Sequence, residues 1–289
     1  MAITVDQKYV QGVGSAGAES DGIQLPYVAP LAWWTNKRSN NKDDGVDYFG
    51  GWAMKLDDYD AGVREYGVLP NWYDDGDGGN IGQLKTCRSV LVAPFGARKR
   101  WMDKEKGDRK TGTHLLQLAY IAYIDNDRKV IPWGPMILSM KSTTAMAYDK
   151  LVAEWAGSTY AARQEFAGGA PPHFFFMPLG TFGKEPVLTE VGKAPNTSKV
   201  THPQVFQYGE FGEKQIDYLY VGNQVAGYMA EFKAQSLDWL SDKKWKSSES
   251  LEEDESATHA AALDTISPAD QVFRPEPPEL FPEGLDFNH

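Results

Sequence analysis

The sequence has little cysteine and no long apolar run, and each shortage excludes a class of protein. A single cysteine, Cys87, cannot form an intrachain disulfide or a thiolate metal cluster, and it is expected to be a small buried side chain. No apolar run approaches the ~20 residues that a helix needs to cross a bilayer. No basic-then-apolar leader opens the chain either. We therefore predict a cytoplasmic protein that makes no membrane contact.

Catalytic and cofactor motifs are equally scarce. The histidines are scattered, and none has the i, i+4 spacing of a helical zinc site. Residues 12–17 match GxGxxG, but the strand and helix that a dinucleotide site requires are missing around them. The loop Asp74–Asn80 lacks the register of an EF-hand, which favours a solvated turn over a weak cation site. We expect a protein that is not an enzyme and uses no cofactor or metal, although a catalytic site assembled only by the fold stays open.

Charge is distributed unevenly along the chain. The net charge is −11, and residues 247–289 contain eleven acidic residues against one base, Arg274, so the rest of the chain is nearly neutral. Residues 85–110 hold nine bases and three acids. A local basic stripe matters more for phosphate binding than the charge of the whole chain.

Residues 84–211 predict five strands interrupted by one helix. Alternating and β-branched residues indicate the strands, and Thr143–Trp155 has helical spacing. The predicted strands are Leu84–Pro94, His114–Ile124, Val130–Ser142, Phe174–Leu179 and Lys199–Tyr208. Three strands, a helix and two strands is the element order of an OB-fold barrel, which holds oligonucleotides or oligosaccharides. We therefore predict a mainly β, α+β fold: a five-stranded OB-fold-like barrel with a helix between strands 3 and 4, plus N-terminal and C-terminal elaborations.

Basic and aromatic side chains in this region predict a groove for an unpaired strand. The segment Phe95–Gly112 is predicted to be a cationic loop, whose bases attract phosphates while rings stack on bases. Solvated lysines at 104 and 106, and core packing of Tyr123 and Trp133, remain as alternatives. If Phe174–Met177 is a strand, at least one of its three phenylalanine rings should face outward, and we predict that this ring is Phe175. The predicted contacts are Lys85, Arg88, Arg98, Lys99, Arg100, Trp101, Lys104, Lys106, Arg109, Lys110, Tyr123, Trp133, Lys141 and Phe175.

Three regions are predicted. Residues 1–24 form a flexible arm, 25–246 an OB-like nucleic-acid-binding domain with additions, and 247–289 a disordered acidic tail. Within the middle region, the aromatic-rich residues 25–83 either join the barrel or cover it. The end of the tail places hydrophobic anchors among acids, and its predicted partner-binding residues are Phe281, Leu285, Asp286 and Phe287.

This layout resembles the single-stranded DNA-binding proteins of phages or mobile elements. It differs from the bacterial pattern, which ends in Ile-Pro-Phe, because this chain ends Leu285-Asp286-Phe287-Asn288-His289. The resemblance implies non-catalytic protection of single-stranded DNA, with RNA as an alternative strand, in a bacterium or a phage-infected host cell. It also implies that replication or recombination proteins bind the tail, and it leaves a homo-oligomer open. The alternative function is a structural or assembly protein of a phage or other element, whose aromatic surfaces make subunit contacts.

Overall fold

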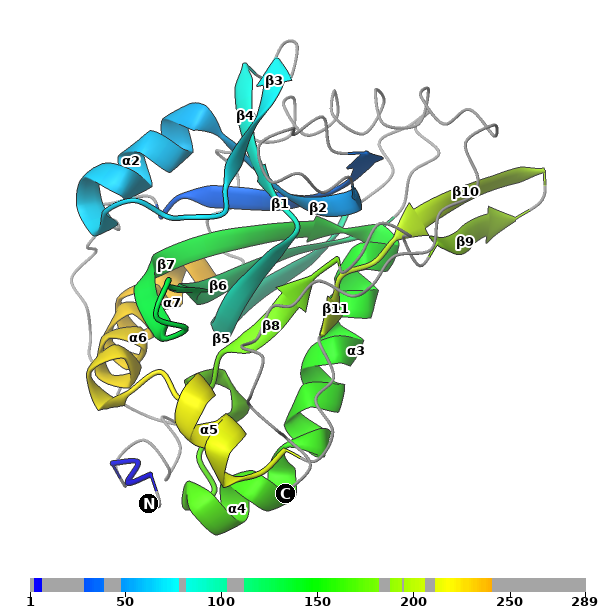
Figure 1. Ribbon diagram of the computed structural model, residues 1–289. Coiled ribbons are helices and arrows are strands. Elements are labelled where there is room, and N and C mark those ends of the chain that lie inside the picture. Colours follow the sequence, from blue (N-terminus) through cyan, green and yellow to red (C-terminus); the bar gives the residue numbers. More distant parts are fainter. Residues whose placement is uncertain are drawn as a thin grey trace.

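The computed structural model describes residues 3–6, 29–38, 48–77, 82–102, 112–181, 188–193, 195–205 and 211–240. These residues form a mixed α+β fold that consists mostly of strands, so the predicted class is confirmed (Figure 1). The strands are β1 (Leu31–Arg38), β2 (Phe49–Lys55), β3 (Tyr73–Asp77), β4 (Gln83–Cys87), β5 (Ser89–Met102), β6 (Gly112–Ile124), β7 (Val130–Lys141), β8 (Met177–Gly180), β9 (Leu188–Lys193), β10 (Asn196–Thr201) and β11 (Gln204–Val205). The helical elements are α2 (Leu56–Tyr66), α3 (Ser142–Ser158), α4 (Tyr160–Phe166), the 3-10 turn η2 (Pro172–Phe174), α5 (Glu213–Leu219), α6 (Asn223–Gln235) and α7 (Leu237–Leu240).

Nine strands form one sheet in the order β11-β8-β5-β6-β7-β1-β2-β4-β3. All neighbouring pairs are antiparallel except β1 and β7, which run parallel. From β5 to β11 three strands are followed by α3, α4, η2 and four strands, so the predicted order of three strands, one helix and two strands is met only up to α3. The sheet is open and does not stop at five strands. The reason is that residues 25–83 supply β1, β2 and β3, so this region joins the sheet and is more than a cover.

Strands β4 and β5 are separated by one residue, Arg88. The first half of this run pairs with β2, from Leu84 to Cys87, and the second half pairs with β6, from Leu91 to Met102. The first part of the segment that was predicted to be a cationic loop, up to Met102, is therefore strand, and residues 103–111 lie outside the described residues. Cross-strand hydrogen bonds from Gly96 onward satisfy its backbone, which a mobile loop would leave to water.

The centre of the sheet is buried on both faces. In β7, every residue from Trp133 to Met140 is buried, which explains the nearly continuous apolar run that made this strand predictable. Helix α3 contacts β6 and β7, as expected for a helix that follows the third predicted strand. On the other side of β6, Tyr120 meets Tyr228 of α6, with ring centroids 5.8 Å apart. Helices thus cover both faces of this part of the sheet (Figure 1).

The triple phenylalanine is not a strand with alternate faces. Phe174 ends the turn η2, and all three rings are buried, with Phe175 1% exposed. The Phe175 ring lies 5.5 Å from the ring of Tyr220, which follows α5. The prediction that Phe175 faces outward is therefore wrong, because the turn breaks the two-residue alternation and α5 covers the ring.

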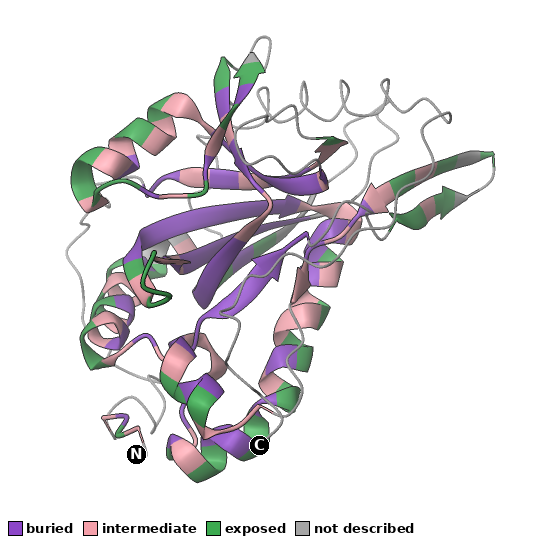
Figure 2. Ribbon diagram, in the orientation of Figure 1, coloured by how far each residue is buried: buried purple, intermediate pink, exposed green. Residues whose placement is uncertain are grey.

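The strands β9 and β10 form a separate two-stranded ribbon that projects from the body (Figures 1 and 2). The ribbon is anchored at Thr201, whose carbonyl accepts a hydrogen bond from Trp34 Nε1 at 2.8 Å and whose amide donates to Asn36 Oδ1 at 3.1 Å. Most of its described side chains are exposed or partly exposed, including Leu188.

Candidate binding pocket

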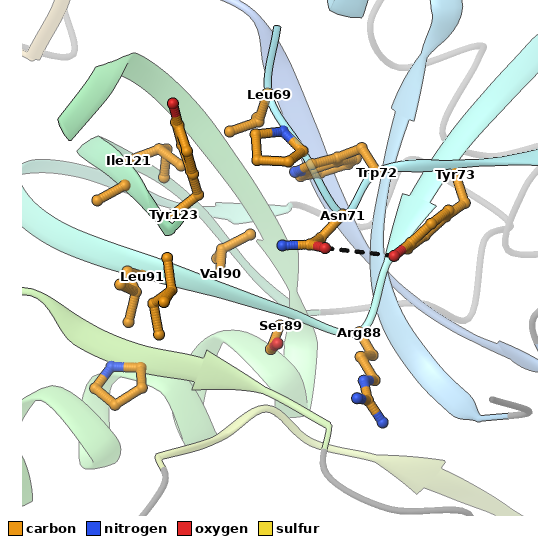
Figure 3. A pocket seen from close by; sticks show the side chains of 14 residues that line it. Leu69, Asn71, Trp72, Tyr73, Arg88, Ser89, Val90, Leu91, Ile121 and Tyr123 are labelled. Atoms are coloured by element: carbon orange, nitrogen blue, oxygen red, sulfur yellow. Dashed lines mark hydrogen bonds between the residues drawn. The ribbon is translucent and has the colours of Figure 1, made fainter. Parts of the chain in front are cut away.

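A pocket of about 310 Å³ lies beside the β4–β5 junction (Figure 3). One side is the segment from Leu69 to Tyr73, which leads into β3. The opposite side is the end of β6, from Ile121 to Ile124. Ser89 to Leu91 form the floor, and Arg88 lies at the rim. The pocket exists because β3 pairs with β4 only up to Thr86, while β6 begins to pair with β5 at Leu91. Between Thr86 and Leu91, one edge of the continuous segment formed by β4 and β5 therefore has no strand beside it.

Aromatic and polar groups share this pocket. Trp72, Tyr73 and Tyr123 contribute rings, and Arg88 and Asn71 contribute polar ends. Figure 3 places Arg88 and Tyr123 on opposite sides of the pocket. Flat rings can stack on a base or another planar group, and a guanidinium at the rim can pair with a phosphate or carboxylate. The arrangement therefore suits a planar ligand that carries an anionic group.

The outer wall of the pocket is held by two ring donors. Tyr59 of α2 donates its hydroxyl to the carbonyl of Leu69 at 2.8 Å, and Trp133 Nε1 donates to the carbonyl of Gly67 at 2.8 Å. Burial raises the pKa of the Tyr59 hydroxyl, although the nearby Lys85 opposes the effect, so the hydroxyl stays protonated and remains a donor at neutral pH. A wall that is fixed in this way needs little ordering when a ligand binds.

The position of Arg88 depends on β8. The Arg88 carbonyl accepts a hydrogen bond from the amide of Thr181 at 2.7 Å. Gly180 packs so closely that a Cβ atom there would lie 2.1 Å from the same carbonyl oxygen. A side chain at position 180 would therefore push β8 away from Arg88, where β4 meets β5. Glycine is required for this close approach.

A cluster of polar side chains lies at the end of β6 that is farther from the pocket. Arg98, Leu116 and Ser139 are directly opposite one another across β5, β6 and β7, and His114 is opposite Lys141 in a neighbouring row. Directly paired residues project from the same face of a sheet. His114 Nε2 and Ser139 Oγ form a hydrogen bond of 3.1 Å. This cluster is largely buried: Arg98 is 5% exposed.

Among the predicted contacts whose side chains the structure describes, Arg88 and Tyr123 line the pocket. Lys85 instead lies 3.0 Å from Asp74 Oδ1 and 5.1 Å from the centre of the Tyr59 ring. Lys99 reaches Asp149 Oδ2 of α3 at 2.5 Å. These two lysines hold elements of the fold together, which the sequence did not indicate.

Two further predicted contacts are buried in the fold. Trp133 is 5% exposed, and its ring packs on Tyr66 with the centroids 5.2 Å apart, so it supports the pocket wall and is not a stacking platform. Arg98 is buried within the sheet because β5 extends through it, and it does not lie on the predicted loop. Together with Phe175, these residues are corrections to the predicted site. Lys141 ends β7 and is partly buried.

The structure does not describe the side chains of the remaining predicted residues. Arg100 and Trp101 occupy β5 opposite His114 and Thr113, and their side chains are not among the described ones. The other predicted loop bases and the tail residues also lie outside the described residues: Lys104, Lys106, Arg109, Lys110, Phe281, Leu285, Asp286 and Phe287.

The sequence did not single out Asn71, Trp72 and Tyr73 as site residues. The available signal was a turn, Pro70-Asn71, placed directly before an aromatic pair. Asn71 has a left-handed backbone with φ of 65°, a conformation that asparagine tolerates better than most residues. This conformation directs the chain into β3.

Within the described part of the chain, no cluster of three or more His, Cys, Asp or Glu side chains is arranged to hold a metal ion. None of the helices in the described ranges is long and apolar enough to cross a membrane. Comparison with protein-family models, with curated proteins and with solved structures gave no match to this chain.

Proposed function

We propose that this chain binds single-stranded DNA without catalysis, and that the pocket at Arg88 is part of the binding surface. The observation that carries the proposal is the grouping of two partly exposed rings, Tyr73 and Tyr123, with Arg88 around one cavity, where the buried Trp72 forms part of the wall. Base–aromatic stacking contributes about 1–3 kcal/mol per base, and an arginine adds salt-dependent attraction to a phosphate. Paired bases in a duplex hide the faces that such rings need, so single strands are favoured.

The path of the strands supports an OB-like arrangement. In the sheet, the strands from β5 to β4 follow the order β5, β6, β7, β1, β2, β4. The first and last of these belong to one continuous segment, because only Arg88 separates β4 from β5. Trp52 of β2 and Leu138 of β7, on two of the strands along this path, are both buried. A partly open five-stranded barrel is the OB-fold arrangement, in which the second and third strands contribute to ligand binding. Their counterparts here are β6 and β7, and β6 ends at the pocket.

The length of β6 is consistent with a site for several nucleotides. From His114 to Tyr123 the strand advances by about 30 Å, at ~3.3 Å per residue. Lys141, which is partly exposed, lies toward one end of β6, and the pocket lies at the other. A site that uses both ends would fall within the roughly 4–16 nucleotides of a single OB fold.

A titration tests the proposal. The tryptophan fluorescence of the full chain should be quenched by an oligo(dT) of about 20 nucleotides and should recover when salt is added. Tyr123→Ala should weaken binding roughly 5- to 150-fold, which corresponds to the stacking energy of one base, about 1–3 kcal/mol. Tyr160→Ala is the matched control, because this ring is 58% exposed on α4 and does not line the pocket. Absence of binding at low salt would reject the proposal, and tighter binding of oligo(U) would redirect it to RNA.

The projecting ribbon favours the assembly protein as the second candidate. An isolated two-stranded ribbon is marginally stable in water, and β9–β10 would gain stability from a neighbouring subunit. Sedimentation of the full chain separates the candidates: concentration-dependent assembly together with no binding to oligo(dT) would favour the structural role.

A further inference from the structure

An arginine occupies a strained backbone conformation in the turn between β6 and β7. Arg128 has a φ of 65°, in the left-handed region that few residues other than glycine, asparagine and aspartate adopt. In the described ranges, only two other non-glycine residues have a positive φ, Asn71 and Ser142, and Asn71 lines the pocket. Strained backbone persists where the surroundings hold it, and it clusters at ligand-binding and active sites. Arg128 is therefore a candidate for a functional side chain.

Hydrogen bonds hold the turn that contains Arg128. The Arg128 amide donates to the Asp125 carbonyl at 3.0 Å, and the Asp125 amide donates to the Lys129 carbonyl at 3.0 Å. The Lys129 amide donates to Asp125 Oδ1 at 2.8 Å. From α5, the Tyr218 hydroxyl donates to the Arg128 carbonyl at 3.0 Å. These bonds use the backbone of Arg128 and not its guanidinium, so a glycine at position 128 would keep them.

The turn begins where one side of the pocket ends. Tyr123 and Ile124, the last residues of β6, line the pocket, and Arg128 follows Ile124 by four residues. The Cα atoms of Ile124 and Arg128 are therefore at most about 14 Å apart, because an extended chain covers ~3.3–3.6 Å per residue. Arg88 lies on the opposite side of the pocket from Tyr123 (Figure 3). The pocket thus has an arginine on either side of it.

The exposed residues of the turn carry a net positive charge. Asn126, Asp127, Arg128 and Lys129 are exposed, so two positive charges stand against one negative charge. Asp125 is partly buried, and one of its carboxylate oxygens is engaged by the Lys129 amide. A positively charged turn beside a pocket attracts phosphate groups.

We infer that Arg88 and Arg128 bracket one nucleotide, with Arg88 on the phosphate at one side of the base in the pocket and Arg128 on the phosphate at the other side. This inference rests on the proposed binding of single strands. Each nucleotide inside a strand has a phosphate on both sides, which matches the two arginines. A guanidinium holds a phosphate through two parallel N–H bonds, whereas a lysine acts on it as a point charge.

Substitutions at position 128 separate the charge from the backbone. Arg128→Gly removes the guanidinium and relieves the left-handed backbone. In titrations of the full chain with an oligo(dT) of about 20 nucleotides, it should reduce the slope of log affinity against log salt concentration by about 0.7, the value of one phosphate. Its melting temperature should rise by about 2–4 °C. Arg128→Lys keeps both the charge and the strained backbone, so the slope and the melting temperature should stay as in the native chain. Arg64→Ala is the matched control, because Arg64 is an exposed arginine on α2.

The outcomes separate this inference from the proposed function. A smaller salt slope together with a higher melting temperature in Arg128→Gly would support the inference, because removal of a purely structural arginine would lower the melting temperature. Strand binding with an unchanged slope in Arg128→Gly, or with an equal loss of slope in Arg64→Ala, would overturn the bracket and leave the proposed function standing. A lower melting temperature in Arg128→Gly would show that the side chain stabilises the turn, and it would also overturn the inference. No binding of oligo(dT) by the native chain at low salt would overturn both.

Discussion

Trp133 Nε1 lies 2.8 Å from the carbonyl oxygen of Gly67 and donates a hydrogen bond to it. This bond joins β7 in the centre of the sheet to the loop that becomes the outer wall of the pocket. The ring is closely packed as well, because a Cβ atom on Gly62 of α2 would lie 2.6 Å from it. The wall is thus attached to both α2 and the sheet, and its shape depends on residues that never touch the pocket.

Tyr59→Phe tests this dependence by removing only a hydroxyl group. We expect the free energy of unfolding to fall by about 1 kcal/mol, the net value of one hydrogen bond. Oligo(dT) binding should weaken roughly threefold, because the Leu69 wall loses one of its two ring donors and must be ordered by the ligand. Chemical denaturation and the fluorescence titration measure the two effects. Tyr160→Phe, which alters an exposed hydroxyl, should change neither, and unaltered affinity in Tyr59→Phe would show that the wall does not need this anchor.

Arg88→Ala tests the contact with phosphate. Each phosphate neutralised on a single strand contributes about 0.7 to the slope of log affinity against log salt concentration. We expect the slope to become smaller by about this amount when Arg88 is removed. Arg64→Ala is the control, since Arg64 is exposed in the last turn of α2. Equal slopes for the two variants would mean that Arg88 meets no phosphate.

Phe175→Ala distinguishes a core ring from a binding ring. Because the side chain is 1% exposed, its truncation leaves a cavity and should lower the free energy of unfolding by about 3–5 kcal/mol. Tyr160→Ala should change it by no more than about 0.5 kcal/mol, as surface substitutions usually do. Urea denaturation measures both. A small loss of stability in Phe175→Ala would support the outward orientation that the sequence suggested.

His173 predicts a loss of stability in acid. Burial, with the positive charges of Lys233 and Arg163, lowers the pKa of His173 to about 4. The unfolded chain takes up this proton near pH 6.5, whereas the folded chain does not, so stability decreases as the pH falls from about 6.5 to about 4. Above and below this window the contribution of His173 is constant.

The contribution of His173 to acid sensitivity should reach about 2 kcal/mol at pH 4.5. The measurement is the free energy of unfolding of the native chain and of His173→Gln at pH 7 and at pH 4.5. The drop between the two pH values should be smaller in the variant, since glutamine does not titrate. Equal drops would show that the folded state protonates His173 normally.

Local patterns predicted many of the elements correctly. Spacing placed a helix at Thr143–Trp155, where α3 occurs. Alternation and β-branched residues placed strands at β6 and β7, because both features act over a few neighbouring residues. The same reasoning wrongly predicted a strand at Phe174–Phe176. The preceding prolines favour a turn there, and long-range contact with Tyr220 buries the middle ring.

The site was predictable only in part. Arg88 and Tyr123 were identified by residue type, but their shared pocket with Trp72 depends on the point where β3 stops pairing and β6 begins. Arg98 and Lys99 illustrate the opposite error, because a cluster of bases in sequence was read as one surface. In a strand such neighbours point to opposite faces, and here one is buried while the other pairs with Asp149 of α3.

The sequence alone determined the α+β class, most of the strands that flank α3, and the separation of an acidic C-terminal segment from a nearly neutral remainder. These properties follow from composition and short-range periodicity, which require no knowledge of distant contacts. The tertiary structure alone decided that β4 and β5 form one bent run, that Trp133 supports the wall of the pocket, and that Asn71 turns its amide toward the cavity. The pairing of the bent run, the support from Trp133 and the cavity that Asn71 faces all depend on contacts between residues far apart in the chain, and local pattern does not encode which distant partners meet.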